Sequence, residues 1–492
     1  MLANTAMINL PSGDDYIRVL PEIILSVAGT VIMVLEPLTS KRRKDWLGYF
    51  AIASLLAALW GASAAYAVGG TAFSNLLVID GFATYFRGLV VIVGILAILA
   101  SFQYLHREKA DKGEYYALIL FSVVGQCLMV SANELIIMFI GLEISSIATY
   151  VLAGFLRDDK RNNESAVKYF LLGSFATAFL LYGIAWIYGA TESTVLPSIR
   201  AALLNHDSNV NLTMVSVAAA LMFVGFAFKV SVVPFQVWAP DVYQGAPAPV
   251  TAFMSAGPKA AAFAMFVRVF MTAFEPITGR WEPFVWAVAL LTMIVGNFAA
   301  LMQTNIKRLL AYSSIAHAGY ILVAIAAHSR IGIQAVMFYT AAYAFMNVGA
   351  FAMVTYFSRQ GERYVNVDDF AGLGWRQPAA SALFSLFILS LIGVPLTAGF
   401  FGKFYIFKAA LDSGLVWLAV FGLLTSAVGA YYYLRILVVM YMKDPQQPAN
   451  TAPPISAGMQ AALWASAIGT LVLGIFPSVL LDFLRVSSTL AR

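Results

Sequence analysis

Apolar stretches of about 20 residues, the length that a helix needs to cross a bilayer, recur from one end of the sequence to the other. Hydrophobic residues make up 61% of the 492 positions and charged residues only 11%, whereas a soluble domain carries roughly 25% charged residues. These stretches exclude a soluble globular fold. They predict a polytopic all-α membrane protein.

Fourteen apolar windows predict about fourteen transmembrane helices. Their approximate ranges are 17–37, 46–68, 82–105, 115–131, 134–156, 164–189, 212–238, 247–274, 283–303, 307–327, 332–357, 379–408, 414–442 and 456–484. The fourth and fifth windows are separated only by the polar step Ser131-Ala132-Asn133-Glu134. That boundary carries the weakest signal of the series.

The distribution of Lys and Arg predicts the orientation in the membrane. The odd-numbered loops hold sixteen of these residues, whereas the even-numbered loops and both tails hold seven. Because cytoplasmic loops are enriched in Lys and Arg, we expect both termini on the periplasmic side of a bacterial inner membrane. The net charge of +5 is spread over short loops rather than gathered in a patch, so we expect no nucleic-acid partner.

Two polar segments suggest an internal repeat. Glu143-Ile-Ser-Ser-Ile-Ala-Thr149 and Ala311-Tyr-Ser-Ser-Ile-Ala-His317 lie 168 positions apart. Five predicted helices separate them, and an odd number reverses the direction of the chain, as in the inverted repeats of transporters. Chance similarity between two serine-rich apolar helices is the alternative. The resulting division is 1–113 (three helices), 114–274 (first repeat), 283–442 (second repeat) and 443–492 (last helix).

Several charged residues fall inside the predicted spans. Three arginines, Arg87, Arg268 and Arg435, lie nearer helix ends, so we expect them to extend toward the interface. The deeper charges are Glu143, Lys168, Lys229, Lys259 and Lys403. A charge at the bilayer centre costs about 2.5–3.5 kcal/mol on insertion scales, which favours a functional role. A purely structural network of ion pairs is the alternative.

Prolines beside these lysines predict helix breaks. Pro234 follows Lys229 by five residues, Pro258 directly precedes Lys259, and Pro395 precedes Lys403. A proline removes one backbone donor, and carbonyls freed at membrane depth need protein or water partners. A hydrated cavity near the membrane midplane is therefore expected. Hydroxyl side chains that either line it or bond their own helix backbone are Ser231, Thr251, Ser255, Ser313, Ser314 and Thr397.

These groups predict a proton relay. Burial weakens the hold of a lysine on its proton, and a nearby carboxylate strengthens it again. We hypothesise that Glu143 and Lys229 form a coupled pair with Lys168 close by. Lys259 would pass the proton to the second half, and Lys403 would release it. His317 either bridges Lys259 and Lys403 or is an ordinary buried histidine.

The sequence carries no chemistry that could power the relay. Gly402-Lys403 is followed by Phe404, so it is not a phosphate-binding loop, and Gly372-Leu-Gly374 does not continue into a dinucleotide fingerprint. Four histidines and one cysteine, Cys127, cannot hold a series of redox centres. We expect neither a cofactor nor a metal in this chain. Its energy would come from another ion gradient or from partner subunits.

The longest motifs contain the predicted relay residues. They are Gly141-Leu-Glu143, Phe226-Ala-Phe-Lys-Val-Ser-Val-Val-Pro-Phe-Gln-Val-Trp-Ala-Pro-Asp-Val-Tyr-Gln-Gly-Ala-Pro247, Lys307-Arg-Leu-Leu-Ala-Tyr-Ser-Ser-Ile-Ala-His317 and Gly393-Val-Pro-Leu-Thr-Ala-Gly-Phe-Phe-Gly-Lys403. With them, nearly the whole chain resembles the subunit N family of proton-pumping NADH–quinone oxidoreductase (respiratory complex I), the bacterial relatives of mitochondrial NADH dehydrogenase subunit 2.

This resemblance implies an antiporter-like fold with two inverted five-helix repeats and broken helices seven and twelve. It implies a translocase subunit without a redox centre, with a proton path through Glu143, Lys229, Lys259 and Lys403, and Lys168 as a further membrane lysine. NADH, FMN, iron–sulfur clusters and quinone would be bound by sister subunits. Expected partners are the antiporter-like chain M, the small membrane subunits and the lipid bilayer. One departure limits the repeat, because Ala311 stands where the first half has Glu143.

Two other classes of protein remain as alternatives. The antiporter-like fold is shared with subunits of multisubunit Na⁺/H⁺ antiporters, and a related hydrogenase or photosynthetic complex could also contain such a chain. A membrane scaffold without transport activity is the third class, and the buried charges argue against it.

The predicted orientation can be measured with a reporter enzyme. A reporter fused after Arg492 should be active only when it lies outside the cytoplasm, because the sixteen basic residues of the odd-numbered loops hold those loops inside. A matched fusion in an odd-numbered loop should report the cytoplasm. Cytoplasmic activity of the C-terminal fusion would refute the predicted topology.

Overall fold

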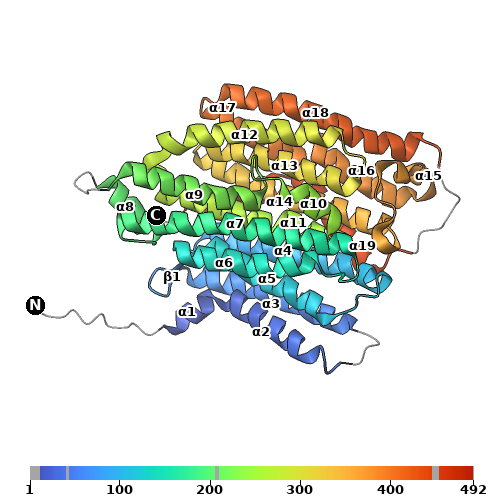
Figure 1. Cartoon of the computed structure of the whole chain (residues 1–492), viewed down its shortest axis with the longest axis horizontal. Helices are drawn as coiled ribbons and strands as arrows, with labels where there is room; N and C mark the ends of the chain where they lie inside the picture. The colour runs from blue at the N-terminus through green and yellow to red at the C-terminus, as the bar shows by residue number, and fades with distance from the viewer. Residues whose placement is uncertain (1–10, 40–43, 206–209, 446–453, 491–492) are drawn as a thin grey trace, which may run out of the picture.

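A computed structural model describes residues 11–39, 44–205, 210–445 and 454–490 as a bundle of helices that run roughly side by side (Figure 1). The chain proceeds from α1–α3 at one edge of the bundle to α17 and α18 at the opposite edge. The basic residues Lys41, Arg42 and Arg43 of the first loop, and the terminal Arg492, lie outside the described residues. Nothing in the structure bears on their predicted side of the membrane.

The first half contains one small hairpin among the helices. Its elements are α1 (Gly13–Arg18), α2 (Leu20–Leu35), α3 (Asp45–Val68), β1 (Gly70–Ala72), β2 (Leu77–Ile79), α4 (Gly81–Arg107), α5 (Gly113–Ser131), α6 (Leu135–Ala153), α7 (Lys160–Thr191), α8 (Leu196–Leu204), α9 (Leu212–Val230), α10 (Trp238–Gly245) and α11 (Ala248–Arg268). The antiparallel β1–β2 pair, with Gly70 opposite Ile79, was not predicted from the sequence, because three-residue strands carry too little pattern to detect.

The second half is helical throughout the part that the structure describes. Its elements are η1 (Val269–Ala273), η2 (Glu275–Ile277), α12 (Thr278–Leu301), α13 (Ile306–Ala326), α14 (Arg330–Phe357), η3 (Gln360–Glu362), η4 (Val367–Phe370), α15 (Leu373–Arg376), α16 (Pro378–Ile392), α17 (Ala398–Asp412), α18 (Val416–Met442), α19 (Ala457–Ile475) and α20 (Ser478–Ser487). The predicted all-α membrane fold is therefore confirmed.

Twelve helices of the described chain are long and apolar enough to cross a membrane. They coincide with twelve of the fourteen predicted windows. The first window corresponds to α2, which has only 16 residues and is about 24 Å long at 1.5 Å per residue. The twelfth corresponds to the split pair α16 and α17, so the total of fourteen spans stays a prediction. The window 456–484 was too long, because α19 ends at Ile475 and the amphipathic α20 follows.

Two predicted prolines lie in interruptions between consecutive helices. Pro234 lies between α9 and α10, after Ser231 has ended α9 in a left-handed conformation with φ 61°. Pro395 lies between α16 and α17, after Gly393 has ended α16 with φ 94°. In both places a residue in the left-handed conformation ends the helix, and a proline, which cannot continue a helix, follows within three residues.

The helix break predicted at Pro258 is wrong. Pro258 lies inside α11, which continues unbroken from Ala248 to Arg268. Gly257 does not adopt a positive φ, so no residue there ends the helix. The proline removes a single backbone donor from a helix whose membrane-spanning window is entirely buried by its neighbours.

Contacts between loops show which loops lie together at each end of the bundle. At one end the odd-numbered loops touch each other: Arg107 donates to the carbonyl of Thr355, Arg161 donates to the carbonyl of Gly361, and Lys443 pairs with Asp368. At the other end the even-numbered loops and the tails touch: Arg18 donates to the carbonyl of Gly69, Arg200 pairs with Glu275, and Arg330 donates to the carbonyl of Arg485. The odd-numbered loops joined by these contacts thus share one end, as alternating spans require.

Three helices form the centre of the bundle. The membrane-spanning window of α11 is 100% buried, and those of α13 and α14 are each 94% buried, whereas α3, α7 and α18 are 39% buried. The helices at the periphery present apolar side chains outward. The central three carry Lys259, His317 and several tyrosines, so polar side chains are concentrated where other helices can satisfy them.

The expectation that Arg87 and Arg268 extend toward the interface is wrong. Both side chains are fully buried. Arg87 pairs with Glu22 at 2.7 Å and also donates to Ser131, whereas Arg268 donates to both carboxylate oxygens of Asp80 at 3.1 and 2.9 Å. A carboxylate on a neighbouring element is available to each arginine, so neither needs to reach water. Arg435 instead donates to the carbonyls of Leu301 and Gln303.

Removing one member of a buried pair should destabilise the fold. In Arg87→Met the carboxylate of Glu22 would stay buried without its cation, and the free energy of unfolding should fall by about 3–5 kcal/mol. Thermal denaturation of the purified chain measures this as a lower Tm. The double variant Glu22→Gln/Arg87→Met removes the stranded charge and should recover most of the loss. A single variant as stable as the wild type would contradict the structural role of the pair.

Candidate functional site

Lys229 lies in the last turn of α9, beside the interruption that follows this helix. Its side chain is buried, and the ammonium donates to the hydroxyl of Ser146 on α6 at 2.9 Å and lies 3.4 Å from the hydroxyl of Tyr169 on α7. The same ammonium is 5.6 Å from the centre of the Tyr169 ring. Hydroxyl oxygens and an aromatic face therefore solvate this cation.

The interruption after Lys229 leaves backbone groups that side chains satisfy. The indole of Trp238 donates to the carbonyl of Phe228 at 2.9 Å, and the backbone N–H of Val233 donates to the hydroxyl of Thr292 at 3.1 Å. Trp238 also stacks on Tyr169 with ring centres 4.4 Å apart. The break is thus built into the packing and fixes the position of the lysine.

The direct Glu143–Lys229 pair that the sequence predicted is absent among the described residues. Glu143 lies three residues before Ser146 on α6, so the two side chains share one face of the helix one turn apart. Ser146 takes the position next to the ammonium. One carboxylate oxygen of Glu143 is buried and has no hydrogen-bond partner among the described residues. The acid therefore lies one helical turn from the serine that binds Lys229, but it does not contact the lysine itself.

Lys168 was expected beside this pair, and that expectation is wrong. Its side chain is 41% exposed and binds the carboxylates of Glu164 and Asp241, each at 2.7 Å. Asp241 also binds Arg308 at 2.6 Å. Consecutive residues on a helix point about 100° apart, so Tyr169 faces Lys229 while Lys168 faces a separate group of charges. This ion cluster links α7, α10 and α13.

Lys259 lies in the middle of the central helix α11. Its ammonium donates to the hydroxyl of Ser314 at 2.6 Å and to the carbonyl of the same residue at 3.2 Å. A small cavity adjoins it, lined also by His317, Thr340 and Tyr343. The space open to the centre of a water molecule there is about 10 Å³, roughly what one ordered water needs.

His317 is held between two tyrosine hydroxyls. Its Nδ1 lies 2.6 Å from the hydroxyl of Tyr339 on α14, and its Nε2 lies 3.1 Å from the hydroxyl of Tyr433 on α18. Tyr433 in turn bonds Ser313. His317 lines the cavity beside Lys259, and its ring meets that of Tyr320 edge-on, with centres 5.7 Å apart. Both ring nitrogens are therefore engaged in a buried polar network.

Lys403 is held by the end of the broken helix. Its ammonium donates to the carbonyls of Leu391 and Ile392 at 3.1 and 2.7 Å, and to the hydroxyl of Ser426 at 2.8 Å. It also lies 5.1 Å from the centre of the Tyr320 ring. The two carbonyls belong to the last turn of α16, where the helix dipole favours a cation. The interruption at Pro395 therefore provides the acceptors for this lysine.

Lys259 and the buried groups of the second half form a sequence of neighbours. Lys259 and His317 line one cavity, His317 touches the ring of Tyr320, and Tyr320 lies against Lys403. The described residues show no hydrogen-bonded chain from Lys229 to Lys259. Buried polar atoms without a protein partner lie on the helices around that interval. They are Ser231 Oγ, Tyr243 OH, Tyr343 OH and Asn347 Oδ1.

Sequence reasoning missed the tyrosines. Tyr339 and Tyr433 hold His317, Tyr169 contacts Lys229, and the ring of Tyr320 lies against Lys403. Their spacing was a usable signal, because Ser313, His317 and Tyr320 recur at i, i+4 and i+7 on one helix face. Of the predicted hydroxyls, Ser314 contacts a lysine and Ser313 reaches Tyr433, whereas Thr251 and Thr397 bond backbone carbonyls.

The chain matches known membrane proteins over almost its whole length. Residues 132–429 match the family described as NADH:quinone oxidoreductase/Mrp antiporter, TM. NADH-quinone oxidoreductase subunit N 1 of Solibacter usitatus is 61% identical over 475 residues, which cover 96% of this chain and 97% of that relative. NADH-quinone oxidoreductase subunit N 2 of Koribacter versatilis is 49% identical over 489 residues, with 97% and 98% covered.

Solved structures agree with these relatives. A chain of respiratory complex I from Thermus thermophilus with bound aureothin superposes with a TM-score of 0.80 at 33% identity, covering 94% of this chain and 98% of that one. A chain of the Mrp complex from Dietzia sp. DQ12-45-1b has a TM-score of 0.83 at 22% identity, with 96% and 97% covered, a likeness of fold alone. The chain is a multi-pass membrane protein that belongs to the subunit N family of the NADH-quinone oxidoreductases.

Proposed function

We propose that the chain moves protons across the bilayer as the N subunit of an NADH–quinone oxidoreductase. One observation carries the proposal: the three most deeply placed lysines, Lys229, Lys259 and Lys403, are bound by hydroxyls and carbonyls and by no carboxylate among the described residues. A lysine solvated in this way can give up its proton without stranding a buried negative charge. This environment favours a relay role for the three lysines over a role in a structural network of ion pairs.

The proposed route follows the neighbours described above. A proton held by Lys229 passes through water at the buried hydroxyls of Ser231 and Tyr243 to Lys259. From there the water-sized cavity leads to His317, which can accept at one ring nitrogen and donate from the other. Lys403 receives the proton last and releases it. Glu143 acts on Lys229 from a position one helical turn from Ser146 on α6, rather than by contact.

The energy for this movement would come from partner subunits. NADH, FMN, the iron–sulfur clusters and quinone would be held by those subunits, with the antiporter-like chain M and the small membrane subunits as the nearest neighbours. This chain would be the translocase part of the enzyme without a redox step of its own. We place it in the bacterial inner membrane with both termini periplasmic and the odd-loop end cytoplasmic.

A multisubunit Na⁺/H⁺ antiporter is the second candidate, because the matching family and one superposed structure include Mrp antiporters. The relatives at 61% and 49% identity are named NADH-quinone oxidoreductase subunit N, which favours the first candidate. Purification of the intact complex with its partners would separate the two, since only the first contains flavin and iron–sulfur subunits.

Replacing a relay lysine should uncouple pumping from assembly. Lys403→Arg keeps a positive charge but cannot be deprotonated. NADH-driven proton uptake by inverted membrane vesicles should therefore be several-fold lower than in the wild type, while the complex still assembles. Lys229→Arg and Lys229→Ala should lower proton uptake in the same way. Lys408→Ala is the matched control, because Lys408 lies on the same helix as Lys403, is exposed and pairs with Asp412. Normal pumping by all three relay variants would remove these lysines from the path.

The tyrosines around His317 provide a separate test. Tyr339→Phe/Tyr433→Phe removes both hydroxyls that hold the imidazole and should slow NADH-driven proton uptake, because the ring loses the partners that fix its donor and acceptor sides. Tyr85→Phe is the control, since Tyr85 is also buried and its hydroxyl donates to the carbonyl of Met337 outside this network. Equal proton uptake by the double variant and the wild type would show that His317 does not need them.

A further inference from the structure

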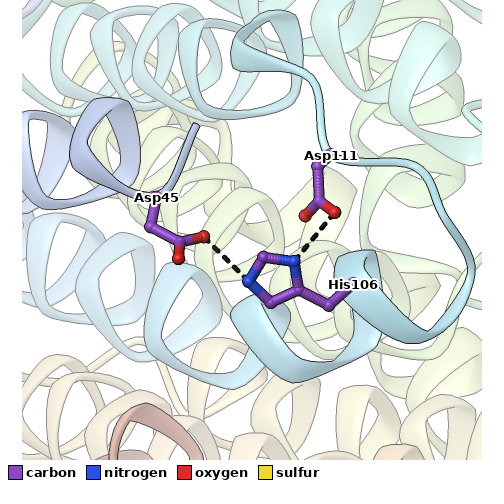
Figure 2. Close-up of side chains that lie close together, drawn as sticks. All are labelled: Asp45, His106 and Asp111. Atoms are coloured by element: carbon purple, nitrogen blue, oxygen red, sulfur yellow. Dashed lines mark hydrogen bonds and ion pairs between the residues drawn. The ribbon is translucent and has the colours of Figure 1, made fainter. Parts of the chain in front are cut away.

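Three side chains converge at the end of the bundle that the odd-numbered loops share. His106 in the last turn of α4 lies between two carboxylates (Figure 2): its Nε2 is 2.9 Å from Asp45 at the start of α3, and its Nδ1 is 2.8 Å from Asp111 in the loop before α5. All three are accessible to water, with side-chain exposures of 48%, 36% and 30%. No step of the proposed proton path uses them.

Two of the basic residues next to this cluster in sequence have other partners. Lys44 pairs with Glu36, and Arg107 is occupied by Glu108 and the carbonyl of Thr355. Each ring nitrogen faces one carboxylate, so the cluster offers two carboxylates and one imidazole to a cation. A divalent cation would complement this set.

The spacing of the donor atoms approaches that of a metal site. Neighbouring ligands around one Zn²⁺ ion, each about 2.1 Å from it, lie roughly 3.0–3.4 Å apart. All three donor atoms lie within 4.8 Å of one another. The imidazole now faces a different carboxylate with each nitrogen, and one ion binds only one ring nitrogen, so the carboxylate of Asp111 must swing toward Nε2. Its position in a loop permits that rotation.

We propose that Asp45, His106 and Asp111 bind one divalent transition-metal ion of the zinc type, with water completing its coordination. An imidazole with two carboxylates suits Zn²⁺, Co²⁺ or Ni²⁺, whereas Ca²⁺ and Mg²⁺ need more oxygen ligands. The bound ion would join the ends of α3 and α4 to the loop that begins α5. The expectation of no metal in the chain rested on its single cysteine and four histidines, which do not exclude a site made of two carboxylates and one imidazole.

The ligands escaped sequence analysis because they are far apart along the chain. Asp45 and His106 are brought together only by the packing of α3 on α4, and Asp111 by the short connection to α5. Among the described residues they are the only three histidine, cysteine, aspartate or glutamate side chains that meet the spacing of a metal site.

Titration calorimetry with Zn²⁺ tests the site on the full-length chain in lipid nanodiscs, purified without a polyhistidine tag. The wild type should bind one ion per chain, and His106→Gln and Asp111→Asn should each weaken binding at least tenfold. His328→Gln is the matched control and should bind as the wild type does. Asp111 lies in a loop, so its variant decides the question if His106→Gln does not fold.

Three outcomes would overturn the proposal. They are no saturable binding at millimolar Zn²⁺, equal affinity in the wild type and in a folded His106→Gln or Asp111→Asn variant, and displacement of Zn²⁺ by an equal concentration of Ca²⁺ or Mg²⁺. Because binding is measured on the isolated chain, the result does not depend on proton pumping.

Discussion

Every charge inside this bundle has to be solvated by protein, because hydrocarbon offers no partner. The structure meets this requirement in two ways. The buried arginines Arg87 and Arg268 are bound by carboxylates, whereas Lys229, Lys259 and Lys403 are bound by hydroxyls and backbone carbonyls. A carboxylate partner fixes the charge of a cation, because loss of the proton would leave an unpaired anion. Neutral oxygen partners stabilise the charged form and tolerate its loss.

Lys307 shows that the distinction does not depend on lysine itself. It was counted as a cytoplasmic loop residue, but its side chain is buried and pairs with Glu362 at 2.6 Å. Glu362 also accepts from the hydroxyl of Tyr104 and from the backbone N–H of Ala248, which begins α11. The pair ties the starts of α11 and α13 to the loop after α14. Within one chain, buried lysines are thus bound either by a carboxylate or by neutral oxygens.

The sequence predicted the elements of this architecture better than their contacts. Hydrophobic length located the spans, and the cost of a mid-membrane charge identified Lys229, Lys259 and Lys403 as candidates. Contacts depend on which helices pack together, and that information is not local. Glu143 and Lys229 were paired by chemistry, yet Ser146 takes the contact position. Pro258, like Pro234 and Pro395, lies near a buried lysine and was therefore predicted to break its helix. The helices end instead where Ser231 and Gly393 adopt left-handed conformations. Tyrosines were overlooked because they count as apolar in a hydropathy window.

The two halves solvate their lysines differently, and the difference limits how each can work. In the first half, Glu143 lies one helical turn from Ser146, the residue that binds Lys229. The second half has Ala311 at the equivalent position, and Lys403 is bound by three neutral oxygens. Two of those oxygens belong to the last turn of α16, and the third belongs to α18. The solvation of Lys403 therefore depends on how the end of α16 is placed against α17 and α18. In the proposed relay, the second interruption would couple helix position to proton release without a carboxylate.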